Sequence, residues 1–379
     1  MANGAAIFPA PSEQLAELTT RARVLEFLLV GGGTLLVLPA LWLTRRVMGW
    51  DSAELAVGFL MFHAAHVIND PHFSVTYWLF YKDARTRAFG DAFVRQQRLR
   101  YLVAGFVVPA LLSIWIGLSF ALDSARGLGW LVQLMFLLVG WHYVKQGFGV
   151  VTVLSARRGV RYTTSERHAL LAHCFAAWAY AWANPAAPLT EAEEKGVIYW
   201  SLAHPLWLER VALSALIASG VLLGFRLARK WRRERQLPPL GPLVSFLVTV
   251  WLWTIFSSWD PLLLYVIPAL HSLQYLYFVA LLRRNQARAS LHEFGPSPRR
   301  QLLLLALAAL ALGWFQFHGV PDLLDAVRMT EHRRGHHPLG AFGPTPFLAA
   351  CFAFVNIHHY FMDNVIWRRE NPEMRALQP

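Results

Sequence analysis

Histidines lie within long apolar stretches of this 379-residue chain, where ionisable side chains rarely occur without a function. Four of the stretches carry clusters of polar residues. The clusters are His63, His66, Asn69, Asp70 and His72; His142, Tyr143, Lys145 and Gln146; His271, Gln274 and Tyr275; and Asn356, His358, His359 and Asp363. A charged side chain at the centre of a membrane helix costs roughly 2.5–3.5 kcal/mol, so polar groups at that depth need partners or a purpose.

Histidines from the four clusters are expected to lie at one depth. His142, His271 and His358 stand nine to twelve residues before the ends of their stretches, which are expected to run in the same direction. At about 1.5 Å per residue, these imidazoles lie about 14–18 Å from the same membrane face. His66 reaches a comparable level if the chain breaks near Pro71. We therefore expect these four histidines to converge on one metal ion.

Groups one helical turn away from the histidines are of the types that support a metal site. The i,i+4 pairs are His66 with Asp70, His359 with Asp363, and His271 with Tyr275. A carboxylate at this spacing can hold the far ring nitrogen of a ligating histidine. Imidazoles suit iron, copper, zinc or nickel, and added carboxylates favour iron or manganese. Non-haem iron is therefore the expected metal, with another divalent metal as the alternative.

Further roles follow for the neighbouring polar residues. His63, His359, Asp70 and Asp363 are additional candidate metal ligands or orienting groups, and Tyr275 and Lys145 are candidate proton donors. The Lys145 amine has other interpretations: snorkelling toward the cytoplasm, pairing with Asp70 or Asp363, or a Schiff base. The side chains of His358 and His359 point about 100° apart on a helix, so one of the two is a packing residue. His63, His72 and His359 stay open as ligands in place of one of the four.

A lone buried histidine is more often a hydrogen-bonded packing residue than a ligand. The histidines assigned as structural or interfacial on that ground are His168, His173, His204, His292 and His318.

The composition of the chain indicates a membrane protein. Hydrophobic residues make up 56% and charged residues 15%, whereas soluble domains have about 45–50% and about 25%. These values exclude a disordered chain, a disulfide-stapled secreted domain and an ordinary soluble enzyme. Cys174 and Cys351 are the only cysteines, which excludes a cysteine-ligated zinc or iron–sulfur site.

Apolar stretches of about 20 residues predict an all-α bundle of about ten (8–10) transmembrane helices. The expected spans are Val24–Leu43, Ala53–Phe80, Tyr101–Leu122, Leu128–Leu154, His168–Ala183, Trp207–Leu227, Leu240–Ser257, Pro261–Leu282, Gln301–Phe317 and Pro346–Trp367. Together they form a single domain over residues 21–368. A short segment (1–20) precedes it and a tail (369–379) follows it, and the longest expected loop (319–345) faces away from the cytoplasm.

The formal net charge of +12 is concentrated in alternate loops. Basic residues follow the even-numbered spans, and Arg45 and Arg46 are the one discordant pair. Cytoplasmic loops carry an excess of Lys and Arg, so both termini are expected in the cytoplasm. The charge therefore reflects topology and contact with anionic lipids, and no basic groove interleaved with aromatic residues suggests nucleic acid. We expect a multi-pass protein of a bacterial inner membrane.

At its polar clusters the chain resembles the Brp/Blh family, integral-membrane β-carotene cleavage dioxygenases that produce retinal. That family carries four histidine-centred motifs, roughly PHGxxD, HFxxxD, HSxxH and PHxxxxD, and is thought to bind one non-haem iron. The matching positions are His66 with Asp70, His142 in Gly140–Tyr143, His271 with Ser272, and His358 with Asp363. The chain departs from the motifs by lacking the first Pro-His-Gly, by Gln146-Gly147 near the second acid, and by Tyr275 at the second histidine of the third motif.

The expected function is that of an integral-membrane oxidoreductase with a histidine-bound iron, acting with O₂ on an apolar substrate from the bilayer. The resemblance implies cleavage of a polyene such as a carotenoid, and a lipid hydroxylation or desaturation is an alternative. A different class of function is a transporter or channel that uses the His/Asp/Lys cluster as a proton or metal-ion pathway. A third interpretation is haem binding by facing histidines, such as His142 and His271.

Overall fold

The computed structural model describes residues 20–184, 191–200, 204–289, 298–333 and 342–377. Apart from one two-stranded hairpin, the regular elements in these ranges are helices, which confirms the expected all-α class. Residues 1–19 of the expected N-terminal segment, 334–341 of the expected loop and 378–379 of the expected tail lie outside the described ranges.

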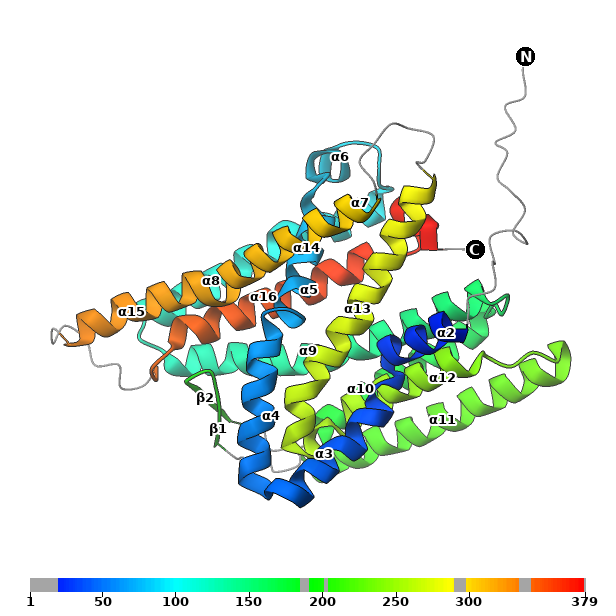
Figure 1. Ribbon diagram of the computed structural model, residues 1–379, viewed down its shortest axis with the longest axis horizontal. Helices are drawn as coiled ribbons and strands as arrows, with labels where there is room; N and C mark the ends of the chain where they lie inside the picture. The colour runs from blue at the N-terminus through cyan, green and yellow to red at the C-terminus, as the bar shows by residue number, and fades with distance from the viewer. Residues whose placement is uncertain (1–19, 185–190, 201–203, 290–297, 334–341, 378–379) are drawn as a thin grey trace, which may run out of the picture.

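Figure 1 shows how the helices are arranged in space. In order they are α2 (Thr20–Phe27), η1 (Leu28–Gly32), α3 (Thr34–Met48), α4 (Trp50–Ala65), α5 (Asn69–Tyr81), α6 (Ala84–Phe89), α7 (Arg95–Leu102), η2 (Val103–Val107), α8 (Val108–Ala121), α9 (Ala125–Arg157), α10 (Thr164–Ala183), α11 (Leu206–Glu234), α12 (Leu240–Leu247), η3 (Val248–Ile255), η4 (Ser257–Trp259), α13 (Pro261–Ala289), α14 (Pro298–Trp314), η5 (Phe315–Gly319), α15 (Val320–Arg333), α16 (Pro346–Ile366) and η6 (Pro372–Leu377).

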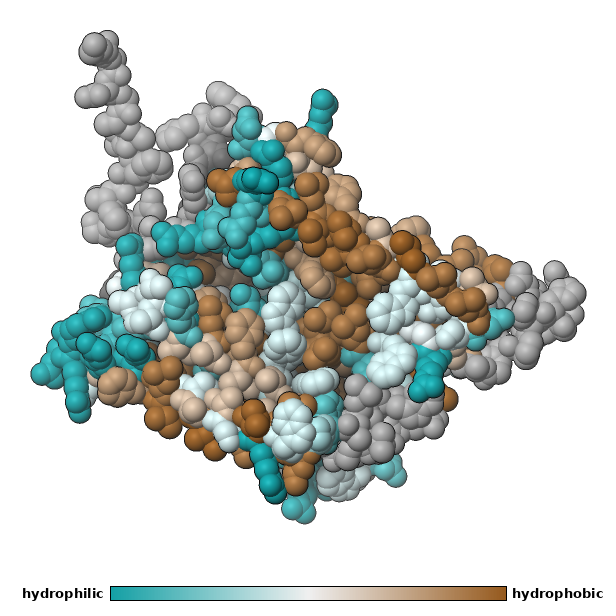
Figure 2. Space-filling view, turned by 180° about the vertical axis from the view of Figure 1, so that it is seen from behind, coloured by the Kyte–Doolittle hydropathy of each residue, from teal (hydrophilic) through white to brown (hydrophobic). Residues whose placement is uncertain are grey.

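Within the described ranges, five helical segments are long and apolar enough to cross a membrane. They are Arg95–Ala121, Ala125–Arg157, Leu206–Glu234, Pro261–Gln286 and Arg300–Val327, and the pair Thr20–Gly32 and Thr34–Met48, bent by 63°, would make a sixth. Large apolar side chains such as Leu111, Ile217 and Leu307 are exposed on these helices. Figure 2 shows a broad apolar area on the rear face, with hydrophilic side chains gathered mainly above it and at one end. These features agree with an integral membrane protein.

The other expected spans are helical but shorter or more polar. α12 and η3 together cover only Leu240–Ile255, and the second expected stretch is divided between α4 and α5. α10 and α16 have 20 and 21 residues but are not among the apolar segments. In α16 the reason is its polar cluster, because two histidines, two asparagines and an aspartate lie in its second half.

The break between α4 and α5 lies before Pro71. α4 ends at Ala65 and α5 begins at Asn69, so residues 66–68 form the break. Pro71 occupies the first turn of α5, where a missing N–H costs no intrahelical hydrogen bond. The helix therefore restarts ahead of the proline, and His72 lies in the first turn of α5, whereas His66 stays at the end of α4.

α16 is a central helix of the bundle. It packs against α5, α8, α9 and α15, and two thirds of its residues are buried. The small side chains of Ala349, Ala350 and Ala353 belong to the same core cluster as Leu128 and Leu131 of α9, which allows the two helices to approach closely. A helix enclosed by other helices can carry polar residues that a lipid-facing helix could not.

α14 crosses α5 at close range. A Cβ atom on Gly313 would lie 2.8–3.0 Å from the backbone and Cβ of Asp70, so the contact requires glycine. The chain then continues through η5 into α15, so residues 320–333 of the expected loop are helical. This path places His318 of η5 against Asp70, with Nε2 and Oδ2 3.2 Å apart.

The acidic segment after α10 forms a hairpin. β1 (Glu191–Glu194) pairs antiparallel with β2 (Val197–Trp200). The two turn residues, Lys195 and Gly196, both have positive φ (49° and 79°), as a type I′ turn requires. β2 packs on α9, where a Cβ on Gly129 would lie 2.8 Å from the carbonyl oxygen of Ile198.

Candidate metal centre

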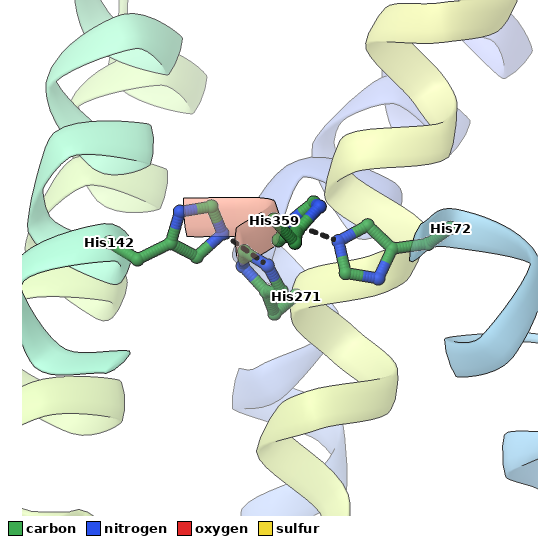
Figure 3. A group of neighbouring side chains, drawn as sticks. All are labelled: His72, His142, His271 and His359. Carbon is green, nitrogen blue, oxygen red and sulfur yellow. Dashed lines mark hydrogen bonds between the residues drawn. The ribbon is translucent and has the colours of Figure 1, made fainter. Parts of the chain in front are cut away.

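Four histidines from four helices meet inside the bundle. His72, His142, His271 and His359 each place one ring nitrogen within 4.8 Å of the other three. Their exposed fractions are 0–4%. Figure 3 shows the four rings directed toward a common centre, and they come from α5, α9, α13 and α16. This four-histidine group can hold a metal ion.

Each ring of the four-histidine group lies against two others. The ring centroids are 4.5 Å apart for His72 and His359, 4.9 Å for His359 and His142, 4.8 Å for His142 and His271, and 5.2 Å for His271 and His72. The Nε2 atoms of His72 and His359 are 3.0 Å apart, and those of His142 and His271 are 3.1 Å apart. Metal–nitrogen bonds of about 2.0–2.1 Å put neighbouring ligand nitrogens about 2.9–3.4 Å apart, so the observed separations fit one shared ion.

Within the described ranges, two outward ring nitrogens of the group lack hydrogen-bond partners, and the inward Nε2 atoms face one another in pairs. Nδ1 of His271 and Nδ1 of His359 are buried and have no partner among the described residues. Leaving a buried polar atom unpaired costs about 1–3 kcal/mol. In addition, only one of two facing Nε2 atoms can carry the shared proton, so lone pairs crowd the centre. A cation that accepts those lone pairs would offset the cost of burying four imidazoles.

His72 is oriented by polar groups of two helices. Its Nδ1 lies 3.2 Å from the Asn69 carbonyl oxygen and 3.1 Å from the Ser272 hydroxyl oxygen. The Ser272 hydroxyl in turn donates to the side-chain oxygen of Asn69 (2.9 Å). A proton held on Nδ1 by a carbonyl leaves the lone pair of Nε2 directed at the centre, as in histidines that ligate metals.

Asp363 adds a carboxylate on the inner side of the group. Its Oδ2 lies 3.5 Å from Nε2 of His359 and 3.8 Å from Nε2 of His142, while its Oδ1 accepts a hydrogen bond from the Trp367 indole (3.2 Å). Asp363 thus faces two of the inward Nε2 atoms, although it is not among the four residues whose ligand atoms all lie within 4.8 Å of one another. The expected proton donor Tyr275 packs its ring on His72 at 4.8 Å. Its hydroxyl accepts a hydrogen bond from Thr76 (2.6 Å).

Glutamine side chains connect the two long helices of the site. The Gln146 side-chain NH₂ of α9 donates to Gln274 Oε1 (2.7 Å) and to the His271 carbonyl oxygen (3.3 Å) on α13. Gln274 donates onward to the carbonyl oxygen of Val30 in η1. These bonds fix the helix register that brings His142 and His271 together.

Two of the four expected ligands lie outside the four-histidine group. His358 is turned away, and its ring nitrogens contact the hydroxyls of Tyr77 (Nδ1, 2.9 Å) and Tyr81 (Nε2, 3.3 Å). Its neighbour His359 occupies the inner position, since adjacent helical residues point about 100° apart. In the four-histidine group, His72 occupies the position expected for His66. The reason is that the chain breaks before Asn69, so the restarted helix α5 carries the inner histidine.

The remaining expected residues gather near His66 or lie apart. His66 and Asp70 form a second group with His318, a histidine expected to be structural or interfacial. His63 lies beside this second group, with its ring centroid 6.1 Å from that of His66. Within the described ranges Lys145 forms no ion pair with either expected aspartate, and its amine lies 6.0 Å from the ring of Phe148.

The geometry is unfavourable for haem between His142 and His271. Two axial imidazoles at about 2 Å from a haem iron would hold their ligand nitrogens about 4 Å apart, with a macrocycle between the rings. The Nε2 atoms are 3.1 Å apart, and the edge of one ring meets the other at a centroid distance of 4.8 Å. That spacing leaves no room for a porphyrin.

No family model matches the chain, and neither the curated proteins nor the solved structures provide a match. Function is therefore inferred from the chemistry of the site.

Proposed function

We propose that the protein is an integral-membrane oxidoreductase that binds non-haem iron in the four-histidine group and uses O₂ on an apolar substrate. The observation that carries the proposal is the meeting of four buried imidazoles from four separate helices. Burying four imidazoles has a cost in desolvation, which a cation bound at the inward Nε2 atoms would offset and packing alone would not. A further carboxylate, Asp363, favours iron or manganese over copper or zinc.

The chain's own residues have distinct roles in this proposal. The four imidazoles bind the metal, which would supply O₂ binding and electron transfer when present. Asp363 adds negative charge beside the ligand nitrogens and balances that of the cation. Aromatic side chains exclude water: Tyr360 stacks on His142, and Phe73 packs on His359. The Tyr275 hydroxyl, hydrogen-bonded to Thr76, holds a proton at the edge of the site.

An apolar substrate from the bilayer is proposed because the site lies within a bundle whose outer faces are apolar. The resemblance to the Brp/Blh family supports a polyene such as a carotenoid, since His142 and His271 of its second and third motifs belong to the four-histidine group. The histidines that match its first and fourth motifs, His66 and His358, do not. A lipid hydroxylation or desaturation is therefore proposed as the second candidate reaction.

The proposed membrane arrangement has ten membrane-embedded segments. In it, α10 and α16 cross as enclosed helices, and α4–α5 and α12–η3 lie within the bilayer. The basic loops and both termini face the cytoplasm of a bacterial cell, as the excess of Lys and Arg after alternate spans predicts.

The proposal is tested with the purified chain in lipid nanodiscs. Iron content is measured by elemental analysis, and O₂ uptake is measured with β-carotene or a fatty acyl lipid. His271→Ala is expected to lose both iron and O₂ uptake, and His173→Gln, which changes a buried histidine on α10 outside the site, is expected to keep both. Iron-free protein without O₂ uptake, combined with proton or metal-ion flux in proteoliposomes, would instead establish the transport alternative.

A further inference from the structure

A second group of metal-binding side chains lies outside the four-histidine group. His66, Asp70 and His318 each offer one ligand atom, and these atoms lie within 4.8 Å of one another. His318 Nε2 is 3.2 Å from Asp70 Oδ2, and His66 Nδ1 is 3.7 Å from the same oxygen. The two imidazole rings are in contact, with centroids 4.1 Å apart. We call these three residues the outer triad.

The outer triad is assembled at two interruptions of regular helix, the break between α4 and α5 and the turn η5. His66 lies in the break after α4, Asp70 lies in the first turn of α5, and His318 lies in the π-helical turn η5. Single π-helical turns occur frequently at functional sites. Inside a membrane, irregular backbone is tolerated where protein covers it or where it lines a polar cavity. Two such irregular segments meeting at one carboxylate are therefore unlike ordinary helix packing.

The close approach of α14 and α5 holds the triad together. Gly313 lies directly on the backbone of Asp70, and the Ser74 hydroxyl donates to Gln316 Oε1 (3.4 Å). These two contacts flank the carboxylate on α5 and join it to the segment that carries His318. The positions of two of the three ligands are thus set by backbone packing and do not depend on flexible side chains alone.

The hydrogen bonding of the triad leaves one ligand atom without a partner. Asp70 is buried, and its Oδ2 is within hydrogen-bond distance of His318. Nδ1 of His66 is also buried, is too far from Oδ2 for a hydrogen bond, and has no other partner among the described residues. A plain His–Asp hydrogen bond needs only two of these residues. The third residue is His66, and its unpaired Nδ1 faces the same carboxylate oxygen, which points to a bound cation.

We infer that the outer triad is a second metal site, which takes one exchangeable divalent transition-metal ion. Two histidines and one carboxylate form the ligand set typical of iron(II) sites that keep open coordination positions. The site differs from the four-histidine group in access, because the side chains of His66 and His318 are 34% and 17% exposed. Asp70 and His72 point about 200° apart around α5, so the two sites share a helix but face different neighbours.

The test counts cobalt ions bound to the full chain in nanodiscs. Metal-stripped protein is titrated with CoCl₂, and bound cobalt is followed by absorption and by elemental analysis after brief exposure to EDTA. The wild type is expected to bind two ions per chain, one of which EDTA removes about 10 times faster than the other, because the protein encloses its ligands less completely. His318→Gln and Asp70→Asn are expected to bind only the slowly removed ion.

Control variants separate this inference from the proposed function. His63→Gln changes a histidine that packs against His66 but lies outside the triad, and it is expected to bind two ions. His359→Ala is expected to lose the slowly removed ion and keep the rapidly removed one. If Asp70→Asn does not fold, His66→Gln at the exposed edge repeats the test.

Two results would overturn the second site: one cobalt ion per chain in both wild type and His318→Gln, or two ions in both. If the wild type binds a single, rapidly removed ion that His318→Gln loses, the outer triad stands and the four-histidine proposal fails.

Discussion

Two adjacent histidines on α16 provide a sharp test, because the structure gives them opposite roles. His359 is fully buried and directs Nε2 at His72 across 3.0 Å, whereas His358 is 2% exposed and contacts two tyrosine hydroxyls. Both are changed to alanine in otherwise identical proteins. We expect His359→Ala to lose metal affinity and His358→Ala to keep it, although the two changes remove the same side chain one position apart.

The expected magnitudes follow from the ligand count. A four-ligand site contributes about 10–16 kcal/mol, so one ligand of four accounts for about 2.5–4 kcal/mol, or about 10²–10³-fold in Kd. At free metal 1,000 times above the wild-type Kd, binding stabilises the wild type by about 4.1 kcal/mol. The same concentration would stabilise His359→Ala by only about 0.4–1.4 kcal/mol. His358→Ala loses two hydrogen bonds, which costs about 1–3 kcal/mol whether or not metal is present.

The assay measures Co²⁺ affinity and the thermal midpoint of unfolding, with and without Co²⁺, for both variants in the same detergent. Metal is expected to raise the midpoint of His358→Ala by as much as that of wild type, from a lower starting value. In His359→Ala the rise is expected to be small. Equal Co²⁺ affinity in the two variants, or loss of affinity in His358→Ala alone, would refute the assignment of the inner histidine.

Three further predictions concern the ligands and the helix contacts around them. Asp363→Asn is expected to weaken Co²⁺ binding about 10–100-fold, and an unchanged Kd would remove Asp363 from the site. His72→Ala is expected to lose the slowly removed metal, and His66→Ala to keep it; elemental analysis after EDTA treatment decides, and the reverse pattern would contradict the position of the helix break. Gly313→Ala is expected to destabilise the protein by about 1–3 kcal/mol through overpacking, whereas Gly149→Ala, with nothing within 4 Å of its Cβ, is expected to be neutral or slightly stabilising. Equal thermal midpoints for these two variants would argue against a close α14–α5 contact.

Much of the fold could be predicted from hydropathy, because a membrane helix needs a long apolar segment whatever its neighbours are. Segments such as Ala125–Arg157 and Leu206–Glu234 fall where the apolar stretches lie. Kinks were harder to place. The π-helical turns and the 63° bend between α2–η1 and α3 depend on packing of distant segments, such as Gly31 against Ser245. Local sequence carries little of that information.

The site was predictable where one histidine stood alone at the required depth. His142 and His271 have no neighbouring histidine on their helices, so depth alone placed them, and both belong to the four-histidine group. For His358 and His359, depth in the membrane cannot tell which one is the ligand. The two side chains lie at nearly the same depth and differ by a rotation of about 100° about the helix axis. The i,i+4 spacing of His359 and Asp363 was the available signal for the inner residue.

The sequence favours His66 over His72, which it leaves open as an alternative ligand, because the helix break is expected near Pro71. Proline is tolerated in the first turn of a helix, so Pro71 marks a helix start more readily than the break itself. With the start at Asn69, His72 lies in the first turn of α5 and His66 falls on the other side of the break. The role of His318 had no local signal, since its partner Asp70 is 248 residues away in the sequence.

The most direct test of the four-histidine site is X-ray absorption spectroscopy of the iron-loaded protein after brief EDTA treatment. For the four-histidine site we expect one remaining iron per chain, with a nitrogen/oxygen shell at about 2.0–2.2 Å and outer-shell scattering from about four imidazoles. In His271→Ala the retained iron is expected to be lost or to show at most three imidazoles. Protein that retains no iron, or iron without imidazole scattering that is unaffected by His271→Ala, would contradict this expectation.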